Sequence, residues 1–284
     1  MVRKFVLLSI LSCALAICGN IYAEDEVLDV YDIATSTLNE HKVDYDTNVQ
    51  WPSFTGNETE VLYSPHVVFG DDDRTLVQTT TSFPYSPIGL VIATYPNGKS
   101  FRGTGFMVSE NVFITNAHVV FNSSRGGYAT QIVFTPGKNN SSNPFGTATA
   151  ATVVAPKKYR ENESDHDYDY AAVKLNRNIG EDCGYFGYKA DANIAGRNVW
   201  ITGYPADYQN YCMYRCKGVI MSREGRKLKY QIDTYGGNSG SPIYRTYTDL
   251  GYTVIGIHWG GSESDSNYGV GFTNPIMNYI ADKL

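Results

Sequence analysis

Short runs rich in Val, Ile, Thr and Tyr, separated by clusters of turn-forming residues, recur through most of this chain. The runs are IGLVIATY, GTGFMVS, NVFITN, TQIVFTP, ATVVAP, YAAVKL, NVWITGY, KYQIDTY and YTVIGIHWG. Such spacing is typical of an antiparallel β-barrel or sandwich. About 218 residues follow residue 66, which is large for one small barrel but suits two packed together. We expect one helix, at the end, where Asn274 can cap the segment TNPIMNYIADKL and Pro275 can occupy its first turn.

The first 23 residues have the pattern of a secretory signal peptide. Two basic residues precede an apolar run that is shorter than the roughly 20 residues a membrane-spanning helix needs. Acidic residues follow closely, so we expect cleavage near Ala23 and a secreted, extracellular product.

Residues 24 to 66 differ in composition from the rest of the chain. They carry ten acidic residues against one basic residue, Lys42, and few aliphatic clusters. The segment is either a functional pro-segment or a solvated acidic linker. From residue 67 onward 19 acidic and 20 basic residues nearly balance, so the net charge of −6 arises mainly in this segment. A nearly neutral body argues against a nucleic-acid partner, and we expect a monomer with no membrane partner.

Three cysteines remain after the signal: Cys183, Cys212 and Cys216. Within a strand, Cys212 and Cys216 would lie about 13 Å apart, beyond the reach of a disulfide. We therefore expect Cys183 to pair with one of them and leave one free thiol. Their spacing matches no zinc signature, and we expect neither a metal nor a cofactor.

Candidates for nucleophilic catalysis stand near strand ends. Attack by a serine needs a base to take its proton and a third group to orient that base. His118 lies in FITNAHVVF, where an apolar strand meets a short polar break, and Asp169 opens the strand-like DYAAVKL. A carboxylate beside a buried strand requires a partner. Ser239 lies in TYGGNSGSP, a stretch that is also compatible with a plain surface turn.

The set TNAHVV, DYAAVKL and GGNSGSP, with YPADY and GIHWGG between and after them, resembles the chymotrypsin-type serine proteases. Within these it resembles the bacterial glutamyl endopeptidases of the V8 type, from VVFGDDDRT to the end of the chain. The resemblance implies an all-β fold of two packed six-stranded antiparallel barrels with a boundary near residues 180–190. It also implies a triad of Ser239 as nucleophile, His118 as base and Asp169 as orienter, with no cofactor and with peptide or protein substrates.

The resemblance assigns further roles around the nucleophile. The backbone N–H groups of Gly237 and Ser239 would form the oxyanion hole, a contribution of about 3 to 4 kcal/mol per donor. Asn238 stands where trypsin-like enzymes carry the aspartate that pairs with the new N-terminal amine. A neutral amide cannot form that ion pair, so activation must proceed differently.

Two specificities compete. Asp233, six residues before Ser239, stands where trypsin-like enzymes bind Lys or Arg. Thr234 and His258 match the residues with which glutamyl endopeptidases receive a carboxylate, and a hydroxyl and an imidazole can donate to one. We favour cleavage after Glu. Trp259 and Gly260 resemble the strand edge that pairs with the substrate backbone.

The family resemblance also predicts a proenzyme. The mature amine would fall on Val67, or on Val61 if the enzyme cuts its own Glu60–Val61 bond, and segment 24–66 would restrain activity until removed. The alternative from another class is an inactive protease-like protein that presents its barrels to a partner.

Overall fold

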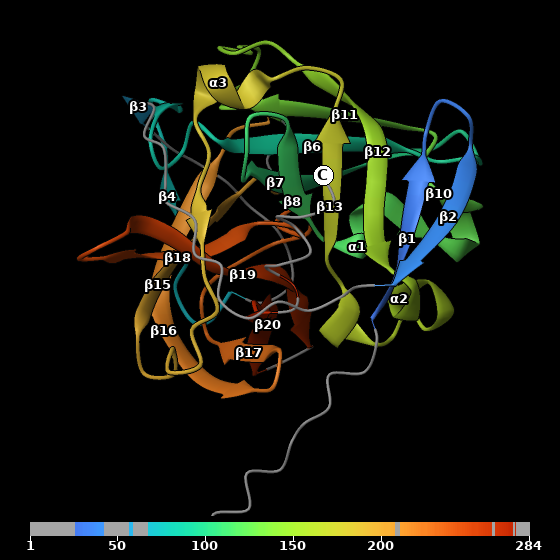
Figure 1. Cartoon of the computed structure of the whole chain (residues 1–284). Coiled ribbons are helices and arrows are strands. Elements are labelled where there is room, and N and C mark those ends of the chain that lie inside the picture. Colours follow the sequence, from blue (N-terminus) through green and yellow to red (C-terminus); the bar gives the residue numbers. More distant parts are fainter. Residues whose placement is uncertain are drawn as a thin grey trace, which may run out of the picture.

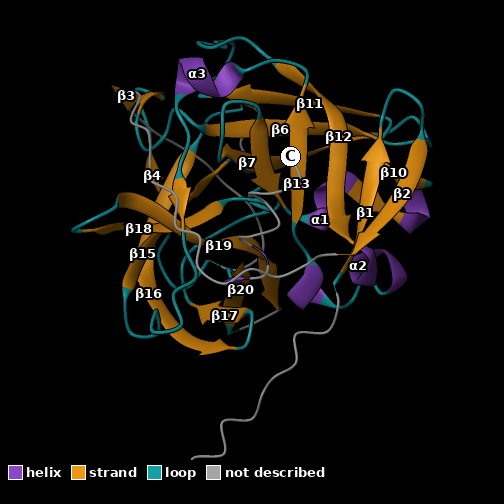
Figure 2. Cartoon of the chain, viewed as in Figure 1, coloured by secondary structure: helices purple, strands orange, loops and turns teal. Residues whose placement is uncertain are grey.

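The computed structural model describes residues 26–42, 57–58, 68–207, 211–262, 265–274 and 276. Strands dominate, and the helices are short and peripheral (Figure 2). The helical elements are α1 (Ala117–Val120), α2 (Lys157–Glu161), α3 (Ile179–Cys183) and the 3-10 turns η1 (Ser123–Arg125) and η2 (His166–Tyr168). Within these described ranges no helix is long and apolar enough to cross a membrane.

The first barrel is a closed antiparallel sheet of six strands. In sheet order they are β11 (Gln131–Pro136), β6 (Ile88–Thr94), β7 (Ser100–Met107), β8 (Val112–Thr115), β13 (Ala171–Leu175) and β12 (Ala148–Pro156). The pairing of β11 with β12 closes the barrel, at Val133↔Thr149 and Phe134↔Ala148. Two further strands, β1 (Val27–Asp32) and β2 (Thr37–Lys42), extend this sheet from β12 (Figure 1).

The second barrel repeats this architecture. Its six strands in sheet order are β18 (Pro242–Tyr247), β15 (Asn198–Gly203), β16 (Tyr214–Glu224), β17 (Lys227–Tyr230), β20 (Ser266–Gly271) and β19 (Gly251–Ser262). The pairing of β18 with β19 closes it. Short additions are β14 (Gly187–Tyr188) parallel to β19 and β4 (Thr75–Leu76) beside β16. Two small separate ladders pair β3 (Asn57–Glu58) with β5 (Thr81–Ser82), and β9 (Phe121–Asn122) with β10 (Gly127–Tyr128).

Three apolar cores explain why two barrels form and why they stay together. One fills the first barrel around Phe113 and Phe134, whose rings stack at 4.5 Å. A second fills the other barrel with mostly aliphatic side chains such as Ile220 and Ile243. The third contains residues of both barrels, among them Phe106, and joins them. Each fully buried large side chain stabilises this arrangement by about 1.5 to 3 kcal/mol. The expected all-β fold of two six-stranded barrels is therefore confirmed.

Part of the acidic N-terminal segment is folded. Residues 27–42 form the β1–β2 hairpin, and β1 pairs with β12 from Leu28↔Pro156 to Asp32↔Thr152. Leu28 is buried, and Tyr31 stacks on Tyr128 at 4.7 Å. This part is thus no solvated linker. Residues 24–25, 43–56 and 59–66 of the segment lie outside the described residues, as do the signal peptide and almost all of the expected C-terminal helix.

Among the described residues the expected disulfide is not formed: Cys183, Cys212 and Cys216 make no disulfide bond. Cys183 lies in the core of the first barrel and Cys216 in the core of the second, so the two barrels separate them. Burial raises the pKa of the Cys216 thiol to about 11 and also raises that of Cys183. The residues that we expected to be paired therefore act as small apolar side chains.

Candidate active site

Adjacent strand ends bring His118 and Asp169 together. Strands β8 and β13 pair in antiparallel register, with Thr115 opposite Ala171, so the residue after β8 and the residue before β13 share one end of the barrel. His118 lies in the single turn of α1 that follows β8. Its Nδ1 lies 2.7 Å from Asp169 Oδ2, and its backbone N–H donates to Asp169 Oδ1 at 2.9 Å. The carboxylate is thereby held by two contacts to one residue.

The two side chains of this pair differ in their exposure to solvent. The Asp169 side chain is fully buried, whereas that of His118 is 32% exposed. Asn116 Nδ2 donates to the carbonyl of Asp169 at 2.7 Å and fixes the backbone there. With Oδ2 facing Nδ1, that nitrogen carries the proton and Nε2 is left to act as a base.

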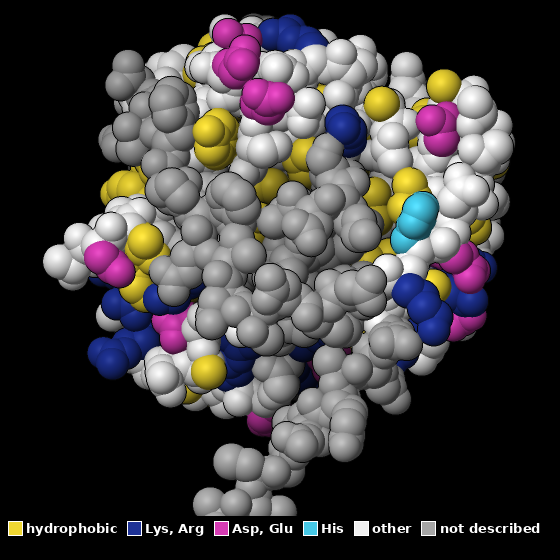
Figure 3. Space-filling view, in the orientation of Figure 1, with side chains coloured by type: hydrophobic (Ala, Val, Ile, Leu, Met, Phe, Trp, Pro, Cys, Tyr) yellow, Lys and Arg dark blue, Asp and Glu magenta, His cyan; other side chains and the backbone are white. Residues whose placement is uncertain are grey.

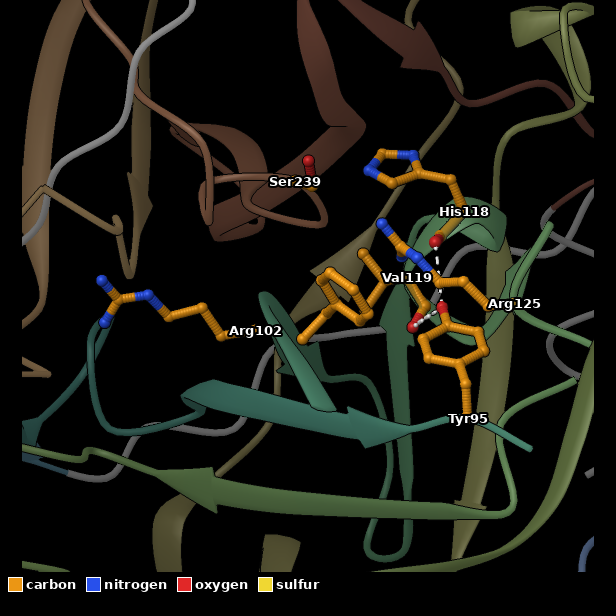
Figure 4. Close-up of a pocket in the computed structure, with 7 residues that line it drawn as sticks. Tyr95, Arg102, His118, Val119, Arg125 and Ser239 are labelled. Carbon is orange, nitrogen blue, oxygen red and sulfur yellow. Dashed lines mark hydrogen bonds between the residues drawn. The ribbon is translucent and has the colours of Figure 1, made fainter. Parts of the chain in front are cut away.

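Ser239 enters from the second barrel, in the loop between β17 and β18. Thr104 of β7 ties this loop to the first barrel: its N–H donates to Ser239 O at 2.8 Å and its hydroxyl donates to Gly237 O at 2.7 Å. Ser239 and His118 line one pocket of about 160 Å³ between the barrels (Figure 4). Ser239 Oγ lies 3.5 Å from the carbonyl oxygen of Trp259. Catalytic hydrogen bonds are often loose before substrate binds.

The nucleophile loop is a tight turn and not a flexible one. Gly237 has φ +108, and a Cβ there would collide with the carbonyl oxygen of Tyr204. The N–H groups of Asn238, Gly240 and Ser241 make backbone hydrogen bonds within the fold. Across the described ranges, the N–H groups of Gly237 and Ser239 have no protein partner. Two such donors in one turn can receive a developing oxyanion.

Thr234 and His258 lie in the buried wall beside this loop. Thr234 is fully buried, and its hydroxyl has no hydrogen-bond partner among the described residues, which is unusual for a buried polar atom. His258, in β19, is 1% exposed. Its N–H donates to Ser241 O at 2.9 Å and its carbonyl accepts from Gly240 N–H at 3.0 Å, so β19 is anchored to the nucleophile loop.

A tyrosine fixes the protonation pattern of His258. The Tyr230 hydroxyl lies 2.7 Å from the carbonyl of Tyr268 and 2.7 Å from His258 Nδ1. Burial raises the pKa of Tyr230 well above its usual value, so its single proton stays in place. That proton must go to the carbonyl, which can only accept, and His258 Nδ1 must then be the donor. A neutral His258 therefore carries no proton on Nε2, and only the imidazolium can donate from that atom.

Asp233 is already engaged by backbone. The residue is 4% exposed, and its two carboxylate oxygens accept the N–H groups of Phe69 and Asp73, each at 2.9 Å. Burial raises the pKa of this carboxyl, while the two hydrogen bonds act in the opposite direction. Asp233 thus binds the start of the body of the chain, an arrangement that argues against its use for a substrate Lys or Arg.

Trp259 and Gly260 lie near the end of β19, next to the nucleophile loop. Strand β18 pairs with β19 only up to Ile257, while β20 pairs with β19 beyond it, including Gly260↔Tyr268. The edge of β19 on the side of Ser239 is therefore free of strand pairing at this point. Trp259 stacks between His166, at 3.9 Å, and Tyr268, at 5.6 Å. These rings line a second pocket of about 300 Å³ next to the first.

Three positioning residues were missed by sequence reasoning: Thr104, Asn116 and Tyr230. Thr104 sits in GTG and Asn116 directly precedes the AHVV turn, so a polar residue inside an apolar run was the available signal. Tyr230 gave none, because a tyrosine in a strand is ordinary.

Two six-stranded barrels, with a His–Asp pair on one and a serine on a tight glycine turn of the other, define the chymotrypsin-like class of serine proteases. The comparisons with known proteins agree. The chain matches the family described as trypsin-like peptidase domain over residues 103–257, more than half its length, and it belongs to this family. It is a V8-type serine endopeptidase that acts on peptide or protein substrates.

The similar proteins include two from Bacillus and one solved structure. A "Glutamyl endopeptidase" of Bacillus licheniformis is 32% identical over 227 residues, which cover 78% of this chain and 69% of that protein. The solved "Structure of Glu endopeptidase in complex with MPD" is 30% identical with a TM-score of 0.67, covering 76% of this chain and 98% of the other. A Bacillus subtilis protein is 38% identical over 236 residues, and the match covers 80% of this chain and 74% of that protein.

The name of the Bacillus subtilis relative, "Extracellular metalloprotease", implies a metal ion. A protein metal site needs a cluster of suitable donors. In the part of the chain that the structure describes, no group of three or more His, Cys, Asp or Glu side chains could hold an ion. The described residues do not fit a metal site, and the chemistry below uses none.

Proposed function

We propose that this endopeptidase hydrolyses peptide bonds with Ser239, His118 and Asp169 and prefers Glu at the residue before the cut. The observation that carries the triad is the His118–Asp169 pair, 2.7 Å apart at the rim of the pocket that also contains Ser239. Together, Ser239, His118 and Asp169 provide a nucleophile, a base and an orienting carboxylate from three distant parts of the sequence.

The reaction follows from this geometry. Ser239 Oγ attacks the scissile carbonyl carbon while His118 Nε2 takes its proton, and Asp169 stabilises the imidazolium that forms. His118 then gives the proton to the leaving amine, and the acyl-enzyme remains. Water attacks the acyl group with His118 again as base, which releases the acid and restores Ser239. The N–H groups of Gly237 and Ser239 bind the oxyanion in both steps.

The preference for Glu rests on Thr234 and His258. The unpartnered buried hydroxyl of Thr234 and an imidazolium at His258 provide two donors for one carboxylate. Trp259 and Gly260 pair with the substrate backbone along the edge of β19. The alternative preference, for Lys or Arg, is disfavoured because both oxygens of Asp233 accept backbone N–H groups.

We further propose that the enzyme is secreted as a monomeric proenzyme with a signal peptide at residues 1–23 and a pro-segment at residues 24–66. The sequence pattern of the first 23 residues and the acidic composition of the next segment support this. The protease domain then begins at Val61 or Val67, and neither nucleic acid nor a membrane is a partner.

Replacement of Ser239 tests the central assignment. Ser239→Ala should lower kcat by on the order of 10⁶-fold and leave the thermal unfolding midpoint almost unchanged. Ser86→Ala is the control, because Ser86 is fully buried, lines neither pocket described above, and has a hydroxyl without a hydrogen-bond partner among the described residues. Full activity in the Ser239→Ala protein would assign the nucleophile to another residue, whereas no turnover by folded, unsubstituted protein would favour an inactive barrel pair.

A further inference from the structure

The β1–β2 hairpin is held to the body by carboxylates that meet basic side chains. Asp29 is fully buried and accepts from Arg160 through both oxygens, at 2.6 and 3.1 Å, and from the Tyr128 hydroxyl at 2.9 Å. Glu40 receives Arg160 at 2.9 Å and Lys157 at 2.9 Å. Acidic and basic side chains meet over β1, β2 and α2 on the surface of this region (Figure 3). Two carboxylates of the hairpin thus share one guanidinium of α2.

A second group of carboxylate contacts, made by Glu26, joins the N-terminal segment to both barrels. Glu26 is 4% exposed, and its oxygens lie 3.3 and 3.1 Å from the guanidinium of Arg226, in the β16–β17 turn of the second barrel. The hydroxyl of Tyr170 donates to the same carboxylate. Tyr170 belongs to the first barrel and directly follows Asp169. Glu26 therefore bridges the barrels next to a candidate triad residue.

The docked hairpin also uses main-chain and apolar contacts. Five residues of β1 pair with β12, while the closing strand β11 pairs only with the other end of β12. Leu28 is buried, and the Tyr31 ring lies against Tyr128. Within the N-terminal segment, residues 26–42 make all of these contacts with the body. Neither pocket of the cleft is lined by a hairpin residue.

We propose that the surface formed by β12, α2, Tyr128, Tyr170 and Arg226 is a docking site for an acidic β-hairpin. Residues 26–42 stay in this site as a non-covalent subunit after the chain is cut between residues 43 and 66. Main-chain pairing gives the site its affinity for a strand, and the guanidinium groups that contact the buried carboxylates give it specificity for acidic residues at the positions of Glu26 and Asp29. Binding of the hairpin to this surface does not require catalytic activity. Only the role of this binding in maturation rests on the proposed proenzyme.

A two-chain form of the protein tests this. A recognition sequence for a site-specific protease is inserted between Asn48 and Val49 of the full-length Ser239→Ala chain. The chain is cut there, and size-exclusion chromatography with intact-mass measurement shows whether the N-terminal fragment leaves the body. We expect the fragment to co-elute with the body at micromolar concentration. Because the protein is inactive, the result is independent of substrate preference.

Variants test whether the contacts between carboxylates and arginine side chains retain the fragment. Removing one partner of a buried pair should weaken binding by about 100-fold or more, so Arg160→Gln should release the fragment. Arg177→Gln is the control, because it breaks an exposed Arg–Asp pair of the first barrel, at 2.9 Å, away from the hairpin. It should retain the fragment. Asp29→Asn, which leaves the sequence of the body intact, should also release it and decides the question if Arg160→Gln fails to fold.

Two results would overturn the proposal. In the first, the fragment separates from the unsubstituted body. In the second, Asp29→Asn retains it as firmly as Arg177→Gln does. Hydrogen exchange on the uncut chain gives a parallel readout: amides of β1 should be protected, and Asp29→Asn should remove that protection while β6 to β8 stay protected.

Discussion

The hydroxyl of Tyr230 offers the sharpest test of the proposed preference for a substrate carboxylate. It accepts the His258 Nδ1 proton because its own proton goes to the carbonyl of Tyr268, with 2.7 Å for each contact. The neutral ring then has a bare Nε2, which can accept from the amide of Gln but cannot donate to Glu. Discrimination between the two side chains should therefore depend on the imidazolium.

Tyr230→Phe removes this constraint. Without the hydroxyl the neutral ring can place its proton on Nε2, and the imidazolium loses a hydrogen bond that favoured it. A charged hydrogen bond contributes about 1.5 to 3 kcal/mol and a neutral one about 0.5 to 1.5 kcal/mol. A difference of roughly 1.4 kcal/mol predicts that the ratio of kcat/KM for Glu to that for Gln falls about tenfold.

Paired peptide substrates that differ only in Glu or Gln before the cut provide the assay. In the unsubstituted enzyme the ratio should fall as pH rises, because the imidazolium is lost, whereas in Tyr230→Phe the ratio should be lower and flatter with pH. Tyr244→Phe is the control, since it removes a buried hydroxyl that bonds Thr202 at 2.9 Å without contacting His258. An unchanged ratio and slope in Tyr230→Phe would refute the reasoning.

Three further predictions concern other parts of the site. Asp169→Asn should lower kcat by about 10⁴-fold in steady-state assays while the fold is retained, because the His118 tautomer is lost. Gly237→Ala should destabilise the chain and abolish turnover, since its Cβ would collide with backbone at φ +108, whereas Gly225→Ala, at φ +59 in open space, should show only a backbone strain of about 1 to 2 kcal/mol in denaturant titrations. Burial lowers the pKa of His166 below its ordinary 6.5, so its neutral form is favoured by folding and stability should fall as pH falls through 6.5 toward the lowered value. His166→Phe should flatten that decline in thermal melts recorded between about pH 5 and 8.

Local signals in the sequence predicted the antiparallel β-structure and gave the candidates for the proposed triad. Alternation and turn residues predicted the strands, and His118 and Asp169 each flank an apolar run whose neighbouring strands pair in register. Strand ends that pair must bring such residues together, so their proximity follows from topology. The resemblance to a family supplied the rest of the arrangement.

Long-range partners could not be predicted in the same way. Asp233 looked like a specificity residue, but its oxygens are occupied by backbone N–H groups more than a hundred residues earlier in the chain. The acidic composition of residues 24–66 left a pro-segment and a solvated linker open and could not predict the docked hairpin, because its partners, Arg160 and Arg226, lie on separate barrels. Cys183 was expected to pair because Cys212 and Cys216 would lie too far apart within one strand, an argument that took no account of the separate cores of Cys183 and Cys216. Each of these outcomes depends on side chains or backbone that only the folded chain brings into contact.

The most direct test of the central claim is the cleavage of a mixed peptide library by the secreted, processed protein, read by mass spectrometry, with the Ser239→Ala protein as control. The proposed site predicts Ser239-dependent cuts after Glu. Cuts after Lys or Arg would assign recognition to Asp233, and an absence of Ser239-dependent cuts from folded, processed protein would contradict the proposed triad itself.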